Sequence, residues 1–206
     1  MLAAVDRDAR RQSFVEAVWR IAERDGAERV SMRAIAAEAG ASVGMLQHHF
    51  TDKDEILVAA IRSRLDAKSA QLARAVGRFG PDADPAQVLA VALRHRLPLT
   101  RSLLVEAQVL TLWLAGDVRS PLKMAVLAQS EQELGEVIVS ALMHARSQGR
   151  LAEGVDIDGI AGALVALNAG LMQGLVLGRY SPRRANRIIQ AQISSLLNEG
   201  MTGSNG

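Results

Sequence analysis

The sequence has no cysteine among its 206 residues, only 3% aromatic residues, and no large excess of charge of either sign. The absence of cysteine excludes a disulfide framework, a thiolate metal site and a cysteine nucleophile. The scarcity of aromatic residues argues against a strand-rich fold, because these residues favour strands. The hydrophobic share of 49% and the charged share of 22% are those of an ordinary globular protein, not of a disordered one.

Positive charge is also scarce where a nucleic-acid-binding region would need it. Residues 1–55 carry 8 Lys and Arg against 10 Asp and Glu. A nucleic-acid-binding face would therefore depend on local placement of basic side chains. Residues 1–11 lack the apolar core that an export signal requires, so we expect a cytoplasmic protein.

One segment, residues 157–178, is long and apolar enough to span a bilayer. Seven of its residues before Gly178 are glycine or polar, and Tyr180 is the only aromatic residue that could anchor it. We therefore interpret the segment as a buried interface helix and expect no membrane partner.

Between glycine and proline residues the apolar pattern is helical throughout, and no stretch alternates with a period of two. The pattern predicts an all-α fold with helices at 7–25, 31–38, 42–49, 52–78, 85–97, 100–115, 119–148, 156–179 and 182–199. Three short helices followed by six longer ones indicate an N-terminal helix-turn-helix head, 1–50, and a helical body, 51–200. We expect the tail, 201–206, to be disordered.

Residues 31–50 contain the most informative pattern. Ser31 and Ser42 can each cap a short helix, and Gly40 between them allows a left-handed turn. Ile35 and Leu46 belong to an apolar interior at this corner, together with Ala36, Ala39 and Phe50. This layout is typical of a helix-turn-helix, whose second helix enters the major groove of DNA.

The second helix offers several candidate DNA contacts. Gly44 costs about 1 kcal/mol of helix stability relative to alanine, so it needs a reason: close approach to a sugar–phosphate backbone, or close packing against the first helix. Gln47 can bond a base edge, and His48 and His49, expected on the exposed side, can donate to phosphate. A metal site or plain surface is the alternative for the histidines, but adjacent helical positions diverge by about 100°, which disfavours a shared metal.

Lys53 lies at the start of the long helix, where free backbone N–H groups attract phosphate. Asp52 and Glu55 predict a capping box at the same place. We expect Lys53, Arg33 and the arginines at 7, 10 and 11 to lie on one side, with the acidic residues at 16, 23, 25 and 28 elsewhere. A solvated charge run is the alternative.

Residues 10–58 resemble the TetR family of bacterial transcriptional regulators. The resemblance rests on the ordered set Phe14, Ala17, Gly26, Ser31, Met32, Arg33, Ile35, Ala36, Ala39, Gly40, Ser42, Gly44, Leu46, Phe50, Lys53 and Leu57. The family usually has tyrosine at the position of Gln47 and valine at that of Ala41, so a phosphate contact through a phenol is in doubt here. The resemblance implies that the DNA-contact positions are Arg33, Ser42, Val43, Gly44, Gln47, His48, His49 and Lys53.

The segment 104–180 is similar, more loosely, to the subgroup named for the repressor of choline-to-betaine genes. The matching pieces are residues 113–114, 118–121, 148–151 and 167–171. This similarity implies a ligand-sensing and dimerising body, without naming the ligand.

Scattered polar groups on apolar helices of the body are candidates for a small-molecule site. They are His95, Glu106, Gln108, Trp113, Asn168, Met172 and Gln173. Because charge is scarce on these faces, we expect a mainly apolar ligand between residues 85–148 and 156–179. Simpler explanations exist for each: His95 at the surface, Trp113 in the core, Glu106 paired with an arginine, and hydrogen bonds of Asn168 and Gln173 across a helix interface.

Small residues recur every four positions along the helix at 156–179 and predict a homodimer interface. The interface candidates are Gly162, Ala166, Gly170, Gly174, Gly178, Ile189, Ile193 and Leu196. Two helices from each subunit would form a four-helix interface, and packing within the same chain is the alternative.

The sequence thus predicts a DNA-binding regulator, a repressor released from a pseudo-palindromic operator by a small effector, with no cofactor and no metal. The histidines at 48, 49, 95 and 144 have no serine or cysteine constellation nearby. Paired-carboxylate motifs and glycine-rich phosphate loops are also missing, which argues against an enzyme. The alternative is a helical small-molecule-binding protein or enzyme without a DNA-binding role.

Overall fold

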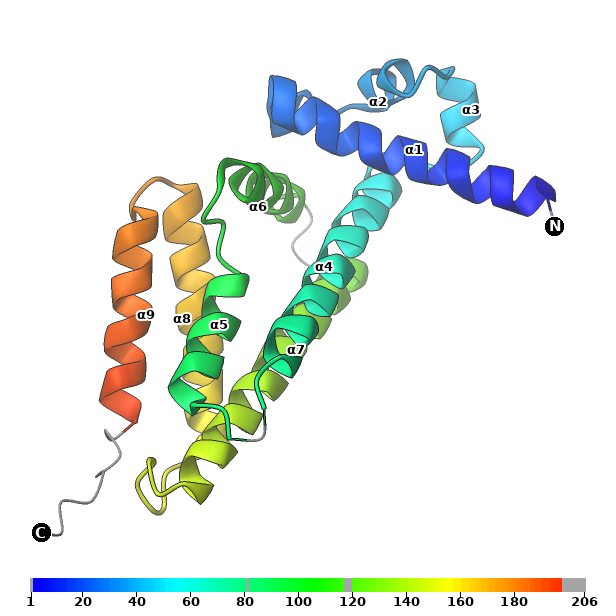
Figure 1. Ribbon diagram of the computed structural model, residues 1–206. Helices are drawn as coiled ribbons and strands as arrows, with labels where there is room; N and C mark the ends of the chain where they lie inside the picture. The colour runs from blue at the N-terminus through cyan, green and yellow to red at the C-terminus, as the bar shows by residue number, and fades with distance from the viewer. Residues whose placement is uncertain (1, 81, 117–119, 198–206) are drawn as a thin grey trace, which may run out of the picture. The chain divides into compact units, whose positions relative to one another are not determined.

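The computed structural model describes residues 2–80, 82–116 and 120–197, and all regular structure in these ranges is helical. The α-helices are α1 (Leu2–Asp25), α2 (Met32–Glu38), α3 (Val43–Gln47), α4 (Lys53–Gly77), α5 (Pro85–His95), α6 (Arg101–Leu114), α7 (Pro121–Ser147), α8 (Ile157–Val176) and α9 (Pro182–Leu196) (Figure 1). The predicted all-α fold is confirmed. Two details were missed: α1 begins five residues earlier than predicted, and a short 3-10 helix, η1 (Ala27–Arg29), follows it.

The chain forms two compact units. Unit 1 comprises residues 1–67 and 100–126, and unit 2 comprises residues 68–99 and 127–206. Helices α4 and α7 contribute residues to both units. The predicted division into a DNA-binding domain, 1–50, and a ligand-binding and dimerising domain, 51–200, stays a prediction. The predicted tail, 201–206, lies outside the described residues.

The core of unit 1 holds the helix-turn-helix corner in place. Phe14 and Ile21 of α1 are buried with Ile35 of α2, Leu46 of α3 and Ile56 of α4 in one apolar cluster. Both tryptophans of the chain, Trp19 and Trp113, are buried in the same cluster. Because α1 and α4 bury their apolar faces against the short helices, α2 and α3 gain a stability that helices of their length lack alone.

The core of unit 2 joins α5, α7, α8 and α9. Leu93, Leu142 and Ile189 are fully buried in it, and α8 and α9 lie side by side (Figure 1). Asn168 is a buried polar residue of this core, and its side-chain nitrogen donates to the carbonyl of Leu93 at 2.7 Å. That bond satisfies a polar group that would be costly to bury alone.

Within the described residues, α8 is the one helix long and apolar enough, by length and composition, to cross a membrane. Core helices of soluble proteins meet the same criterion, so a single such helix is weak evidence for a membrane span. Only 33% of the most apolar 18-residue stretch of α8 is buried inside the chain. Apolar surface of α8 therefore remains uncovered.

Candidate nucleic-acid interface and small-molecule cavity

The corner between α2 and α3 has the local geometry that the sequence predicts. The hydroxyl of Ser31 accepts from the backbone N–H of Ala34 at 3.2 Å, and that of Ser42 accepts from Met45 at 3.1 Å. Gly40 has φ +62°, the left-handed conformation expected at the turn. The two predicted caps and the predicted turn are confirmed.

One face of the corner is buried and the other is open to solvent. Ile35, Leu46 and Phe50 are at most 1% exposed, whereas Gly44 and Gln47 are exposed. Among predicted contacts, Arg33, Ser42 and His48 are also exposed, and Val43 is half-buried. The first turn of α3 is therefore accessible to a large ligand such as DNA.

Gly44 has no packing partner that would explain it. A Cβ atom built at Gly44 would have only the Ser42 hydroxyl within 4 Å, at 3.9 Å. Close packing against the preceding helix, the alternative explanation, is therefore wrong. Alanine would fit here without a clash in the isolated chain and would favour the helix. The other explanation, close approach to a sugar–phosphate backbone, stays a prediction.

His49 departs from its predicted place on the exposed side. Helix α3 ends at Gln47, so His49 leaves the helical face and is half-buried, with its ring 5.6 Å from the ring of Phe14. Burial lowers the pKa of His49, and the positive charges of Arg7 and Arg11 lower it further. Positive charge is thus gathered around His49, as predicted for the arginines at 7, 10 and 11.

Arg11 belongs to the internal structure of the corner. Its guanidinium lies 4.0 Å from the centre of the Phe50 ring, donates to the carbonyl of His49 at 2.7 Å, and is 3.8 Å from the carboxylate of Glu55. Arg33 and Lys53, in contrast, form no ion pair with the described residues. These two exposed cations can bind phosphate without losing a protein partner.

Some acidic groups of unit 1 are paired with arginines of α1. The carboxylate of Glu38 binds Arg24 at 2.8 Å and Arg20 at 2.9 Å. The hydrogen bond from Arg24, followed by that from Arg20, lowers the pKa of Glu38. A region with more acidic than basic residues can thus still present unpaired positive charge beside α3.

The start of α4 fixes the position of Lys53. Asp52 accepts from the backbone N–H of Glu55 at 2.8 Å, and Glu55 accepts from the backbone N–H and hydroxyl of Thr51 at 2.7 and 2.9 Å. The predicted capping box is confirmed, with Thr51 as the donor to Glu55. Lys53 is therefore the first residue of α4.

The predicted ligand-site residues are divided between the two units. Glu106, Gln108 and Trp113 belong to unit 1, and His95, Asn168, Met172 and Gln173 to unit 2. The simpler explanations hold for three of them: Glu106 pairs with Arg64 at 3.5 Å, Trp113 is in the core, and Asn168 bonds across a helix interface. His95 is half-buried rather than at the surface, with a ring nitrogen 2.9 Å from the carbonyl oxygen of Lys68.

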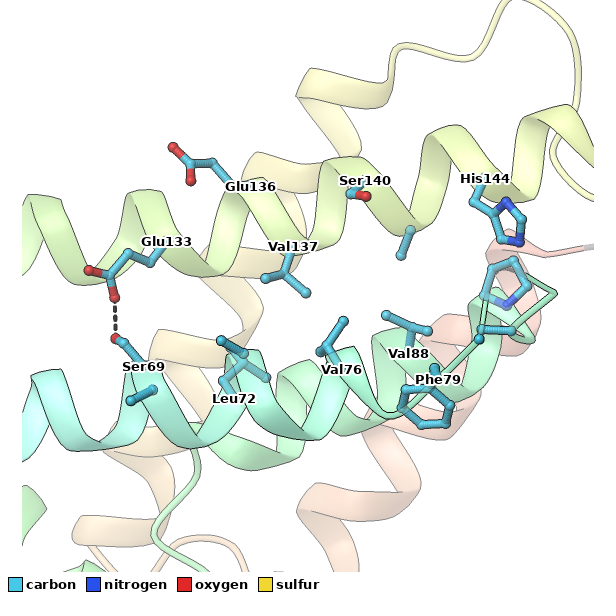
Figure 2. Close-up of a pocket in the computed structure, with 16 residues that line it drawn as sticks. Ser69, Leu72, Val76, Phe79, Val88, Glu133, Glu136, Val137, Ser140 and His144 are labelled. Carbon is cyan, nitrogen blue, oxygen red and sulfur yellow. Dashed lines mark hydrogen bonds between the residues drawn. The ribbon is translucent and has the colours of Figure 1, made fainter.

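Unit 2 contains a cavity of about 740 Å³ that the sequence reasoning missed. Leu72 and Val76 of α4 and Val137 of α7 point into it from opposite sides (Figure 2). The full lining is Ser69, Ala70, Leu72, Ala73, Val76, Phe79, Gly80, Ala83, Pro85, Val88, Glu133, Glu136, Val137, Ser140, Ala141 and His144. Its size and mainly apolar lining match those of small-molecule sites.

Polar groups line the cavity along its length. At one end the Ser69 hydroxyl donates to Glu133, Ser140 lies further along α7, and His144 lies at the other end (Figure 2). Glu133, Val137, Ser140 and His144 follow one another at three or four residues along α7. This spacing could have been recognised in the sequence, because it places all four side chains on one face of the helix.

The predicted dimer stripe on α8 divides into three parts. Gly162, Ala166 and Gly170 are exposed, and a Cβ built at either glycine would have no atom within 4 Å. At Gly174, a Cβ would come within 2.2 Å of the Tyr180 ring, so this position packs against its own chain. Gly178 lies beyond the end of α8, with φ +66°.

The predicted interface residues of α9 also require correction. Ile189 and Ile193 are at most 2% exposed and belong to the core of unit 2, because α9 turns this face towards α5. Leu196 is half-buried against the same core. For Ile189 and Ile193, packing within the same chain is the correct interpretation.

The family model for bacterial regulatory proteins of the tetR family matches residues 14–60. The HTH-type transcriptional regulator PksA of Bacillus subtilis (strain 168) is 26% identical over 194 residues, which cover 93% of this chain and 92% of PksA. The chain belongs to the TetR family.

Two further similar proteins are a repressor and a regulator of known structure. The nicotine-responsive transcriptional repressor HdnoR of Paenarthrobacter nicotinovorans is 36% identical over 89 residues, 43% of this chain and 42% of HdnoR. A regulator from Saccharomonospora viridis, solved in complex with choline, has a TM-score of 0.78 at 20% identity and covers 92% of this chain and 98% of its own.

TetR-family membership establishes this chain as a DNA-binding transcriptional regulator and not an enzyme. All eight predicted DNA-contact residues, from Arg33 to Lys53, fall inside the matched residues 14–60. The lining of the cavity, from Ser69 to His144, falls outside them. The family match therefore bears on DNA binding and says nothing of the ligand.

Proposed function

We propose that this chain is a cytoplasmic, homodimeric repressor that leaves a pseudo-palindromic operator when a small, mainly apolar molecule occupies the cavity of unit 2. The solvent-facing first turn of α3, where Gly44 has no packing partner in its own chain, carries the DNA-binding part. HdnoR is a nicotine-responsive repressor, which supports both the sign of regulation and the response to a small molecule.

The DNA-contact residues divide into two roles. Arg33 and Lys53 are exposed cations without an ion pair among the described residues, so they bind phosphate and fix the protein on the duplex. Gln47 is exposed near the end of α3 and can bond the edge of an adenine. Ser42 and Gly44 let the helix N-terminus approach the sugar–phosphate backbone. Further contacts come from Val43, His48 and His49.

Substitution of Lys53 and Gln47 tests these roles. Lys53→Ala should weaken binding to all DNA sequences and lower the slope of log affinity against log salt by about one unit. Gln47→Ala should change the preferred sequence at one or two positions more than it changes non-specific affinity. Arg78→Ala, an exposed cation of unit 2, is the matched control and should leave the salt slope as it is.

The operator sequence can be selected from random DNA with the wild-type protein, and both variants can be titrated on it. An unchanged salt slope for Lys53→Ala would remove this residue from the phosphate contacts. A wild-type protein without DNA affinity at low salt would instead support the alternative, a helical small-molecule-binding protein.

We propose that the homodimer forms through the uncovered apolar surface of α8. Gly162, Ala166 and Gly170 are exposed on one stripe of a helix that is only one-third buried in its most apolar part. Small residues on such a stripe let a second helix approach closely and lose little side-chain entropy on burial. An isologous contact around a two-fold axis also suits two recognition helices about 34–36 Å apart on DNA.

Gly170→Leu tests the interface without disturbing the subunit, because no atom lies within 4 Å of a Cβ built there. The leucine should overfill the contact, shift the sedimentation coefficient towards that of a monomer and weaken operator binding. Asp158→Leu, on an exposed position near the start of the same helix, is a control for added apolar surface. A fully dimeric Gly170→Leu protein with wild-type DNA affinity would place the interface elsewhere.

The ligand response requires only a modest coupling between cavity and DNA. A coupling free energy of about 1–3 kcal/mol changes DNA affinity by roughly 5- to 150-fold. A compound found by thermal-shift screening should release operator DNA in a mobility-shift assay. Val137→Trp, which fills the cavity from α7, should abolish the thermal shift without weakening DNA binding in the absence of ligand.

A further inference from the structure

Met45 places an apolar side chain on the open face of the helix-turn-helix corner. Its side chain belongs to the second residue type of α3 that is apolar and large, but it does not join the core: Met45 is 42% exposed, whereas Val43 and Leu46 pack in the apolar cluster of unit 1. Within residues 14–60, all of which the structure describes, no other large apolar side chain is as exposed. Single exposed apolar residues are common on protein surfaces, so the place of Met45 decides whether it has a role.

The helical period puts Met45 beside the residue that faces most directly outward. Successive residues of an α-helix are turned by about 100°, so Gly44 lies about 160° away from the buried Leu46. Met45 and Gln47 each lie about 100° from Leu46, on opposite sides. Gly44 has no side chain, and the side chains of Met45 and Gln47 therefore flank a shallow strip of open backbone.

Local hydrogen bonds fix the backbone from which the Met45 side chain projects. The backbone N–H of Met45 donates to the Ser42 hydroxyl at 3.1 Å, which is the cap of α3. The carbonyl of Met45 accepts from the backbone N–H of His48 at 3.3 Å. Both backbone polar groups of Met45 are thus satisfied inside the corner, and its side chain is the part left for another molecule.

A thioether side chain cannot read the polar groups of a base edge in the way that Gln47 can. The major groove offers one apolar group, the C5-methyl of thymine, and apolar side chains contact it. Methionine is unbranched and has three rotatable bonds, so it can follow an irregular surface such as a groove wall. The chemistry of Met45 therefore matches a methyl group on a pyrimidine.

We propose that Met45 is a specificity-determining residue that contacts the C5-methyl group of a pyrimidine in the major groove. The methyl group is that of thymine, and 5-methylcytosine carries the same group at the same place. This inference rests on the proposed function, in which the first turn of α3 faces operator DNA. Gln47 and Met45 then read hydrogen-bonding groups and a methyl group, respectively.

Replacement of thymine by deoxyuridine tests the contact, because it removes the methyl group and keeps every hydrogen-bonding group of the base. The operator is selected from random DNA with the full wild-type chain. Each thymine of one half-site is then replaced singly, and affinities are measured by fluorescence anisotropy. At one or two positions the wild-type affinity should fall about fourfold, the loss expected for one buried methyl group.

Met45→Ala should remove this methyl effect. At the same positions, deoxyuridine should change the affinity of Met45→Ala by less than about 1.5-fold, because the two substitutions delete the same contact. Alanine is a strong helix former and Met45 is exposed, so α3 should remain folded. Met45→Leu keeps an apolar side chain and should retain a methyl effect of at least about twofold.

The second test adds a methyl group instead of removing one. At a position found with deoxyuridine, the T·A pair is replaced by C·G and by 5-methylcytosine·G. The added methyl should strengthen wild-type binding about fourfold and leave Met45→Ala within about 1.5-fold. Met124→Ala, a methionine of unit 1 that is 52% exposed and lies on α7, is the matched control and should respond to the methyl as the wild type does.

A half-site in which no thymine methyl changes the wild-type affinity by twofold would overturn the proposal. A methyl effect of the same size in Met45→Ala would also overturn it, because another residue would then make the contact. In either case a wild-type protein that binds its selected operator keeps the proposed function. A wild-type protein without DNA affinity at low salt would refute the proposed function, and this inference with it.

Discussion

The α2–α3 corner and the cavity of unit 2 are built in different ways. In the corner, each special residue has a partner within five positions: Ser31 bonds Ala34, Ser42 bonds Met45, and the turn at Gly40 is closed by a bond from Ala41 to Ala36. In the cavity, Ser69 meets Glu133 from 64 positions away. The corner is a local structure, whereas the cavity is a product of packing.

Because of this difference, related proteins can share the structure of the corner while the lining of the cavity varies among them. A corner made of short-range bonds keeps its shape whenever a few residue types recur at fixed spacing. A cavity lined by α4, α5 and α7 changes with any side chain that enters it. DNA recognition and ligand choice can therefore diverge independently.

Phe50→Ala should have the largest effect. Phe50 is 1% exposed and lies edge-on to Phe14, 6.5 Å between ring centres. Truncation of a buried phenylalanine costs about 3–5 kcal/mol. We expect a lower urea midpoint and loss of operator binding, with the sedimentation coefficient of the proposed dimer retained through unit 2. Leu142→Ala, fully buried in unit 2, should also lower the urea midpoint and should weaken operator binding through loss of that dimer. Loss of the dimer in Phe50→Ala as well would show that the two regions fold as one.

Gly174→Leu should destabilise unit 2 itself, whether or not the protein is a dimer. A Cβ at this position comes within 2.2 Å of Cδ2 of Tyr180, so the ring must move. Overpacking of this kind costs about 1–3 kcal/mol. Thermal melting should show a lower Tm for Gly174→Leu than for Gly170→Leu, which lies one turn away on open surface. Equal Tm values would mean that Tyr180 moves aside freely.

Ser42→Ala should lower stability by about 1 kcal/mol through loss of the cap of α3. Because α3 has only five residues, fraying of its first turn should also weaken operator binding. Ser31→Ala removes the corresponding cap of α2 and should cost similar stability with a smaller effect on DNA affinity. A larger DNA defect in Ser31→Ala would contradict the assignment of α3 as the recognition helix.

The smallest effect concerns pH. Hydrogen bonds from the backbone and hydroxyl of Thr51 lower the pKa of Glu55 below its usual value near 4.5. Its carboxylate therefore adds stability that is present above the usual pKa and is lost as pH falls through the lowered value of the folded state. The difference in Tm between wild type and Glu55→Gln should shrink between about pH 6 and about pH 3. A pH-independent difference would rule out this linkage.

Sequence reasoning succeeded where the determinants are short-range. Helix positions, the two serine caps, the left-handed Gly40 and the capping box at Asp52 all follow from residue types at fixed spacing. It failed at His49, because this residue lies two positions beyond the end of α3, where the side chain no longer follows the helical face.

Long-range packing explains the other failures. Five small residues on α8 share a helical period, but only the position of Tyr180 separates the open Gly170 from the covered Gly174. The ligand candidates were chosen because they are polar residues on apolar helices. Asn168 shows why that criterion is insufficient: its side chain satisfies a carbonyl of a neighbouring helix instead of facing a cavity.

The placement of the two tryptophans has a practical consequence. Trp19 and Trp113 are buried in unit 1, the cavity is in unit 2, and Tyr180, the single tyrosine, is also in unit 2. The chain thus carries intrinsic optical reporters in the half that holds the recognition helix and none of them lines the cavity. A change in tryptophan emission when a colourless ligand binds would measure communication between the halves directly, without a label and without DNA.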